Sequence, residues 1–151
     1  ITRAVASIYL GLQTELHIGN LDAERDWGHA RDYVRGMWQI LQQDKPEDYV
    51  LATGTSKTVR QFVELAFAEV SITLEWSGTG VEETGVCKAS GKVMVRVDPR
   101  YFRLTEVDCL LGDASKALRD FGWKAEVTLD DLVAEMVEYD IANLKTKTSD
   151  T

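Results

Sequence analysis

The sequence predicts a mixed α/β domain, and three patterns along its 151 residues support this fold class. Apolar residues recur at helical spacing in several segments, a run of alternating valines has strand spacing, and polar or glycine-rich stretches separate them. With 44% apolar residues, the chain is long enough to bury the core of one domain.

The first part of the chain predicts a helix, a strand, a loop and a second helix. The first helix is indicated by an apolar stripe that Gly11 would end: Ile1, Val5, Ile8 and Leu12. Glu15–Ile18 predicts a short strand, and the polar, irregular run Leu21–Asp32 predicts an ordered loop. Asp32 is expected to cap the second helix. The apolar face of that helix would consist of Tyr33, Val34, Met37, Trp38 and Leu41.

The middle of the chain predicts three strands around a third helix. Tyr49–Thr53 is a compact apolar run, typical of a strand that is covered on both faces. After a turn at Gly54, a helix is predicted from the stripe Val59, Phe62, Val63, Ala66, Phe67 and Val70. Thr73–Trp76 predicts a strand, and Ser77–Lys92, which has no period, is expected to contain a surface loop or a mobile turn. Val93–Val97 predicts a strand with its valines on one face.

The last part predicts two helices. Asp113 or Ser115 would cap a short helix that Gly122 closes. Thr128 and Asp131 form a carboxylate variant of the capping box. The longest apolar stripe follows: Leu129, Leu132, Val133, Met136, Val137, Ile141 and Leu144. From Lys145 onward the chain is polar and is expected to fray.

Few predicted strands are available to pair with Tyr49–Thr53. We therefore expect its partner strands to lie in sequence that precedes this chain, which opens on Ile1 without an initiator methionine. A strand without partners also predicts that the chain is poorly stable or self-associates.

Composition limits the classes of partner. The net charge of −8 and a pI near 4.8 disfavour a nucleic-acid or acidic-membrane surface, and no apolar run is long enough to span a bilayer. Cys87 and Cys109 form no C-x-x-C pair, so we expect inert thiols and a cytoplasmic protein.

Four other side chains invite functional interpretations that their surroundings do not favour. His17 and His29 lack partners at metal-ligand spacing, so no metal site is expected. Trp27 and Trp38 are expected to be packing residues, with stacking on a base as the alternative for Trp27.

A candidate nucleotide-binding pattern, Arg103-x-x-Glu106, follows the predicted strand at Val93–Val97. Arginine suits a two-pronged grip on phosphate, and a carboxylate suits the vicinal hydroxyls of a ribose. By spacing alone, the alternative is a surface ion pair worth little stability.

Several separate segments, in order, carry a family resemblance. They are residues 19–22, 25–34, 49–54, 99–108, 112–113 and 121–124. The chain resembles, from Ile1 to about Leu144, the C-terminal part of the GDP-mannose 4,6-dehydratase family, which are extended short-chain dehydrogenases/reductases. The resemblance implies the substrate-binding part of that fold together with the last helix and strand of its Rossmann sheet.

The resemblance also assigns roles to residues. It implies that Arg25 and Arg103 grip the diphosphate of GDP, that Glu106 accepts hydrogen bonds from the ribose hydroxyls, and that Ile18–Asn20 passes near the guanine. Residues 1–144 would form a nucleotide-sugar-binding region that is incomplete without an upstream Rossmann domain, and residues 145–151 would be a polar tail. Leu104 stands where the family usually has proline, and Cys109 where it usually has a larger aliphatic residue.

The catalytic half of the family pattern is not in this sequence. Gly78–Gly85 has the wrong spacing for the glycine-rich phosphate turn, and no tyrosine is followed by lysine four residues later. The resemblance therefore implies that NADP and the catalytic residues belong to a missing N-terminal domain.

In the intact family member, the expected function is that of a lyase in GDP-fucose and deoxysugar biosynthesis. GDP-D-mannose becomes GDP-4-dehydro-6-deoxy-D-mannose through an internal NADP redox cycle, in a protein expected to be a homo-oligomer. The chain alone is expected to be inactive. The alternatives are a non-catalytic GDP-sugar-binding or interaction module and part of a sister GDP-sugar epimerase or reductase.

Overall fold

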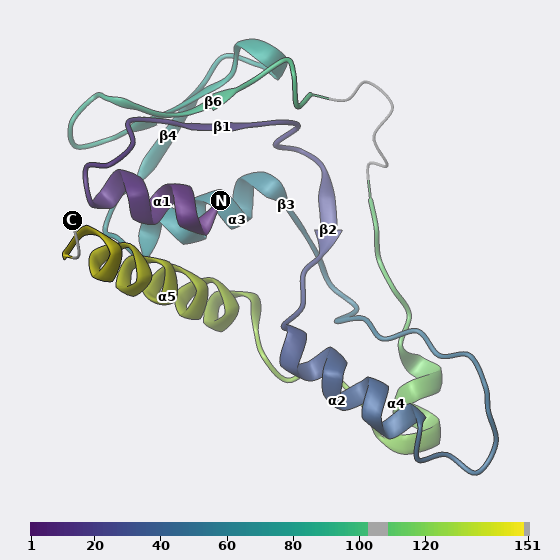
Figure 1. Cartoon of the computed structure of the whole chain (residues 1–151). Helices are drawn as coiled ribbons and strands as arrows, with labels where there is room; N and C mark the ends of the chain where they lie inside the picture. The colour runs from purple at the N-terminus through teal and green to yellow at the C-terminus, as the bar shows by residue number, and fades with distance from the viewer. Residues whose placement is uncertain (103–108, 150–151) are drawn as a thin grey trace.

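The computed structural model describes residues 1–102 and 109–149 and confirms the α/β class (Figure 1). One sheet has the strand order β1-β6-β5-β4. Its strands are β1 (Leu16–Ile18), β4 (Leu74–Ser77), β5 (Thr84–Cys87) and β6 (Val93–Val97). A separate two-stranded ribbon pairs β2 (Glu24–Asp26) with β3 (Ser56–Thr58). The helices are α1 (Thr2–Tyr9), α2 (Ala30–Ile40), α3 (Val59–Ala68), α4 (Ser115–Phe121) and α5 (Leu129–Ser149), and η1 (Gly80–Glu82) is a short 3₁₀ turn.

The main core lies between the sheet and three helices. Figure 1 shows α1, α3 and α5 gathered on one side of the sheet. The β6 valines point into this layer, with Val95 fully buried, as their alternation predicts. The buried residues of the core come from all of these elements: Val5, Leu16, Leu21, Phe62, Val63, Ala66, Phe67, Val95, Val97, Val133 and Val137.

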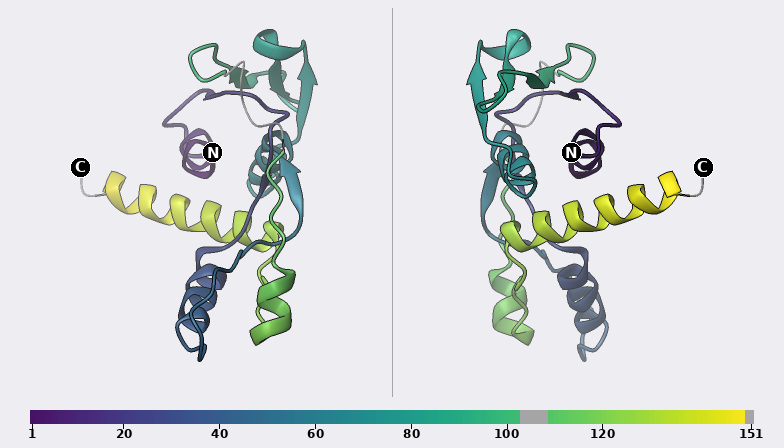
Figure 2. Two further views of the ribbon diagram at one scale, coloured as in Figure 1. Left: turned by 90° about the vertical axis from the view of Figure 1, so that its right-hand side faces the viewer. Right: turned by 90° about the vertical axis from the view of Figure 1, so that its left-hand side faces the viewer.

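A second, smaller group of elements projects away from the sheet. Figure 2 shows α2 and α4 extending from the same end of the molecule in both views. Trp123 forms its centre: the ring is 1% exposed, and its Nε1 donates to the carbonyl oxygen of Asp32 at 2.9 Å. A Cβ at Gly36 would lie 2.7 Å from this nitrogen, so the close packing of α2 on Trp123 requires glycine.

Most predicted helix boundaries are confirmed. Thr58 and Gln61 form a full capping box on α3. Thr128 Oγ1 accepts from the backbone N–H of Asp131 at the start of α5, and Gly122 ends α4 with a left-handed φ of 71°. Helix α5 extends past Lys145, where a polar tail was expected, and ends at Ser149. Lys147 lies in the last turn, where its positive charge interacts favourably with the negative end of the helix dipole. This interaction is consistent with the extension of the helix.

The predicted strand at Tyr49–Thr53 is wrong, because residues 46–53 have no regular secondary structure. A strand needs a neighbouring strand, whereas this run lies against α2 and the segment near Gly112. Leu51 Cδ1 would be 2.6 Å from a Cβ at Gly36, and Ala52 Cβ would be 2.3 Å from one at Gly112. The apolar character of residues 49–53 therefore reflects contact with α2 and with the loop at Gly112.

Two predicted loops contain strands. The run Leu21–Asp32 includes β2, and Ser77–Lys92 includes η1 and β5. These strands are three or four residues long, and their sequences lack regular apolar alternation. The predicted cap of α2 is also wrong. His29 caps that helix through its ring nitrogen Nδ1, which accepts from Arg31 N–H at 2.9 Å, while Asp32 lies inside the first turn.

The apolar face of α2 is largely uncovered by the described residues. Trp38 was predicted to pack, but it is 62% exposed. Val34, Met37 and Leu41 are also exposed. A helical stripe specifies which side of a helix is apolar and leaves open what covers it. In the described part of the chain, no helix combines the length and apolar character needed to cross a bilayer.

Candidate functional site

Arg25 lies at the centre of the β2–β3 ribbon. It pairs with Lys57 across the antiparallel ribbon, and its neighbours Glu24 and Asp26 pair with Thr58 and Ser56. Strand alternation places the two carboxylates on one face and Arg25 on the other. The Arg25 side chain is half-buried, and its Nη1 donates to the carbonyl oxygen of Glu24 at 2.6 Å.

An open pocket of about 340 Å³ adjoins Arg25. The walls come from the ribbon, from α2, from the irregular run before Thr53 and from the segment after residue 108. The lining residues are Arg25, Asp26, Tyr33, Val50, Leu51, Ala52, Leu110, Leu111 and Gly112. The pocket thus sets Arg25, Asp26 and Tyr33 among largely apolar walls, a composition suited to orienting a ligand by a few polar contacts.

Glu24 holds the ribbon to two other segments. Its carboxylate accepts from Ser56 Oγ at 2.7 Å, and its carbonyl oxygen accepts from Leu110 N–H at 3.3 Å. Glu24 also forms an isolated parallel bridge with Cys109. Hydrogen bonds from Ser56 and then Cys109 lower the pKa of the Glu24 carboxyl, so it remains ionised beside Arg25 at neutral pH.

Asp26 joins three segments on the same face of the ribbon. Its Oδ1 accepts from the N–H of Thr53 at 2.9 Å and from the hydroxyl of the same residue at 2.6 Å. Its Oδ2 accepts from Gly54 N–H at 3.0 Å and Gly112 N–H at 3.4 Å. The residue that precedes Arg25 and the one that follows it therefore both bind to the segment at 109–112.

Arg103 and Glu106 lie outside the described residues. The described residues on either side of them contact the chain that leads into Arg25. Tyr101 packs on Gly19, where a Cβ would lie 2.3 Å from the Tyr101 carbonyl oxygen. Cys109 bridges to Glu24. Residues 19–24 thus contact both neighbours of the segment that carries Arg103 and Glu106.

Ile18–Asn20 lines a pocket at the carboxyl ends of β1 and β6. These two strands are parallel, with Ile18 opposite Val97, so their ends meet at one edge of the sheet. Arg100 and Tyr101 complete this pocket with Ile1 and Val59. Arg100 is held there by Asp98, whose Oδ2 accepts from its Nη2 at 2.6 Å.

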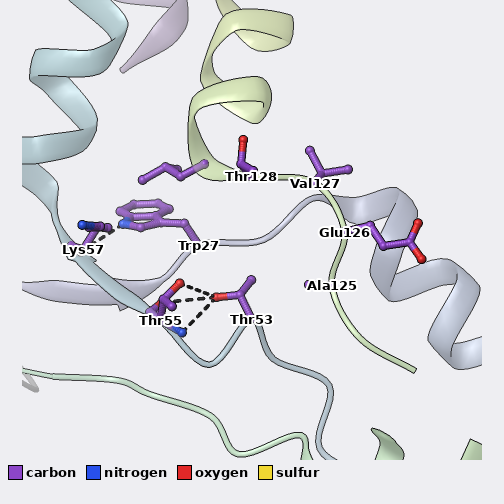
Figure 3. A pocket seen from close by; sticks show the side chains of 9 residues that line it. Trp27, Thr53, Thr55, Lys57, Ala125, Glu126, Val127 and Thr128 are labelled. Atoms are coloured by element: carbon purple, nitrogen blue, oxygen red, sulfur yellow. Dashed lines mark hydrogen bonds between the residues drawn. The ribbon is translucent and has the colours of Figure 1, made fainter. Parts of the chain in front are cut away.

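A third pocket lies between the ribbon and the start of α5 (Figure 3). Trp27 forms one wall, packs on Phe62 with ring centroids 4.7 Å apart, and donates from Nε1 to the Lys57 carbonyl oxygen at 3.1 Å. The prediction that Trp27 is a packing residue is confirmed. The hydroxyls of Thr53 and Thr55 are 3.2 Å apart and bond to one another, as the dashed lines in Figure 3 show.

The two histidines have structural partners. His29 caps α2 and its Nε2 lies 3.3 Å from Glu135 Oε1, while His17 Nδ1 lies 3.7 Å from Asp98 Oδ2. Within residues 1–102 and 109–149, no three histidine, cysteine or acidic side chains gather in a way that could hold a metal ion.

Sequence reasoning proposed Arg25 as a site residue and gave Asp26 and Glu24 no part in positioning it. Their partners Thr53, Gly54, Ser56 and Gly112 are far away in the sequence. No periodic pattern reports such contacts. The available signal was weaker: two carboxylates flank an arginine at strand spacing.

The chain is similar to one protein family over most of its length. A family model described as GDP-mannose 4,6 dehydratase matches residues 1–136. A GDP-mannose 4,6-dehydratase from Sinorhizobium fredii (strain HH103) is 60% identical over 145 residues, which are 96% of this chain and 41% of that protein. The chain spans about two fifths of the length of the curated relatives it matches.

Two solved structures share the fold at low sequence identity. RMD from Pseudomonas aeruginosa, complexed with NADPH, gives a TM-score of 0.74 at 18% identity and covers 94% of this chain and 41% of that one. UDP-glucose 4-epimerase from Bifidobacterium longum, in complex with NAD⁺ and UDP, gives 0.68 at 22% identity and covers 95% and 39%. The expected fold of an extended short-chain dehydrogenase/reductase is confirmed.

Proposed function

Since the chain belongs to the GDP-mannose 4,6 dehydratase family, we propose that it is the substrate-binding portion of an NADP-dependent dehydratase. The intact protein would convert GDP-D-mannose to GDP-4-dehydro-6-deoxy-D-mannose. Residues 1–144 would bind the nucleotide-sugar, and a Rossmann domain outside this chain would complete the enzyme. The binding energy of the GDP moiety would hold the sugar in place for the reaction.

The position of Arg25 is the observation that carries this proposal. Arg25 follows directly on residues 19–24, which contact Tyr101 and Cys109 on either side of the segment that contains Arg103 and Glu106. Two arginines from distant parts of the sequence can grip one diphosphate only if the fold brings their segments together. This arrangement supports assigning Arg25 and Arg103 to the diphosphate and Glu106 to the ribose hydroxyls.

The described residues do not fit the phosphate groups of NADP. A Rossmann cofactor site needs a glycine-rich turn from a strand into a helix. Gly78 and Gly80 instead belong to the connection from β4 through η1 into the antiparallel strand β5. We therefore assign no step of hydride transfer to these residues, and we propose that NADP binds to the sequence outside this chain.

The uncovered apolar face of α2 also supports a division of the intact protein between this chain and a domain outside it. Met37, Trp38 and Leu41 are exposed on a helix that belongs to a chain spanning about two fifths of its relatives. Burial of such a face is favourable by roughly 25 cal/mol per Å². We propose that the remainder of the intact protein covers it.

Titration of GDP into the chain tests the proposed binding site. Arg25→Ala and Arg103→Ala should each weaken GDP binding by about 1.5–3 kcal/mol, the range for hydrogen bonds to charged groups. Arg119→Ala is the matched control, because this arginine is exposed on α4 and pairs with Asp120. Unchanged GDP affinity in both test variants would refute the site.

A second measurement separates binding from catalysis. The chain alone, supplied with GDP-D-mannose and NADP, should form no 4-keto product. Product formed by the purified chain would show that the catalytic groups are within these residues.

A further inference from the structure

The carboxylate of Asp26 is almost entirely committed to holding other segments. It accepts three backbone N–H groups and one hydroxyl, from Thr53, Gly54 and Gly112. Three of these four bonds are 3.0 Å or shorter. A carboxylate with several backbone donors of this kind fixes its own main chain relative to theirs.

The segments that Asp26 joins are packed at contact distance. A Cβ at Gly112 would lie 2.3 Å from Ala52 Cβ, so only glycine allows the segment at 112 to lie against the run that ends at Thr53. Asp26 bonds to the backbone on both sides of this contact. Residues 53–54 and 112 therefore hold a common position relative to β2.

The bonds of Asp26 also constrain Arg25, through the main chain. It is the residue before Asp26, and strand alternation turns its side chain to the opposite face of the ribbon. Glu24, the residue before it, is bound to Ser56 and Leu110 in the same way. The backbone of Arg25 is thus fixed on both sides by carboxylate or carbonyl contacts to the segments 53–56 and 110–112.

We propose that Asp26 is a positioning residue for diphosphate binding: it fixes Arg25 against residues 110–112, the continuation of the segment that carries Arg103 and Glu106. This inference rests on the proposed function. Asp26 lines the same pocket as Arg25, but its carboxylate oxygens are occupied by the N–H groups and the hydroxyl named above, so it would act through Arg25.

Electrostatics alone predicts the opposite effect of removing Asp26. A negative charge next to the site repels a diphosphate, so neutralising it should tighten binding. A positioning role predicts weaker binding, because Arg25 loses its fixed place. The sign of the change therefore distinguishes the two roles.

The test is a titration of GDP into wild type and Asp26→Asn. Asparagine has one acceptor oxygen where aspartate has two, so its amide cannot serve the N–H donor of Oδ1, from Thr53, and those of Oδ2, from Gly54 and Gly112, at the same time. GDP affinity should fall by roughly tenfold. Asp32→Asn is the matched control: it also removes one negative charge, but Asp32 bonds to the backbone of Glu126 and Val127. Its GDP affinity should stay within about twofold of wild type.

A double-mutant cycle separates positioning from general loss of structure. If Asp26 acts through Arg25, Asp26→Asn should change GDP affinity by less than about twofold in an Arg25→Ala background. Equal weakening in both backgrounds would overturn the positioning role. Tighter or unchanged binding in the single variant would overturn it as well.

Two further outcomes keep the proposals distinct. If Asp26→Asn does not fold, Thr53→Val removes the hydroxyl donor to Oδ1, together with the bonds of that hydroxyl to Thr55. It should weaken GDP binding by roughly threefold, again only when Arg25 is present. If wild type does not bind GDP, or Arg25→Ala binds as wild type does, the proposed function itself fails. If those results hold and the variants of Asp26 and Thr53 are neutral, only the positioning role fails.

Discussion

A Cβ on Gly28 would lie 2.1 Å from the hydroxyl oxygen of Tyr33. The Tyr33 ring stacks near Trp123, with centroids 6.3 Å apart, so it has little freedom to move aside. The turn into α2 therefore needs glycine at this position for lack of space.

Gly28→Ala should destabilise the chain by about 1–3 kcal/mol, the usual cost of overpacking. Urea unfolding would measure this change. In a Tyr33→Ala background the same substitution should cost clearly less, because the ring that it meets is gone. Equal costs in the two backgrounds would contradict the proposed steric cause.

Asp32 connects α2 to the segment before α5. Its Oδ2 accepts from the N–H groups of Glu126 at 2.8 Å and Val127 at 2.9 Å. Burial raises the pKa of this carboxyl, but the bonds from Val127 and Glu126, followed by the charges of Arg35 and Arg31, outweigh burial and lower it.

Asp32→Ala should lower the free energy of unfolding by about 1–3 kcal/mol, because two backbone donors lose their acceptor. Asp32→Asn should cost less, since a single amide oxygen can take the place of Oδ2. Chemical denaturation of both variants checks this order. An alanine variant as stable as the asparagine variant would contradict it.

Asp98 predicts an acid-sensitive contribution to stability. Hydrogen bonds from the side chain and then the backbone N–H of Arg100 lower the pKa of Asp98 from 3.8 to about 2. Because the folded pKa is the lower one, the contribution is fully present above the unfolded value near 4. It is lost as the pH falls through about 2.

Asp98→Asn should therefore have a shallower loss of stability than wild type between about pH 5 and pH 2. The measurement is the urea midpoint at several pH values, with Asp130→Asn, a first-turn aspartate of α5, as a control. Parallel curves for wild type and Asp98→Asn would show that the pair with Arg100 does not stabilise the fold.

The exposed face of α2 predicts self-association of the chain when it is studied alone. Exposed apolar surface of this kind is normally covered. We expect the wild-type chain to associate as its concentration rises, and Met37→Lys with Trp38→Lys should restore the monomer in sedimentation velocity. Tyr139→Lys, on α5 where Tyr139 is also exposed, is the control and should have little effect. A wild-type chain that stays monomeric would contradict the expectation.

The helices and the valine strand could be predicted because their burial is periodic. The stripe in α3 and the alternation in β6 each report one covered face, and both elements were found close to their predicted positions. The ribbon β2–β3 could not be predicted in this way. Its strands read Glu-Arg-Asp and Ser-Lys-Thr, and polar contacts to distant segments stabilise them.

The run Tyr49–Thr53 shows the opposite error, because a strand was predicted where the structure has none. Its composition indicates burial, which holds for Ala52 at 8% exposed but not for Val50 at 53%. Composition also does not distinguish a neighbouring strand from a neighbouring helix. For the candidate site, Arg25 was proposed through family resemblance. The contacts of Asp26 could not be predicted, because its partners lie 27, 28 and 86 residues away along the chain.

The sheet has one strand that joins it from far away in the sequence. The strands β4, β5 and β6 form an antiparallel meander from adjacent segments, whereas β1 pairs in parallel with β6, Leu16 opposite Val95. Closing the long loop between β1 and β6 costs chain entropy before contacts between the two strands can offset it. We therefore expect the meander to form first and β1 to dock last, so that docking of β1 would be the slow step of refolding.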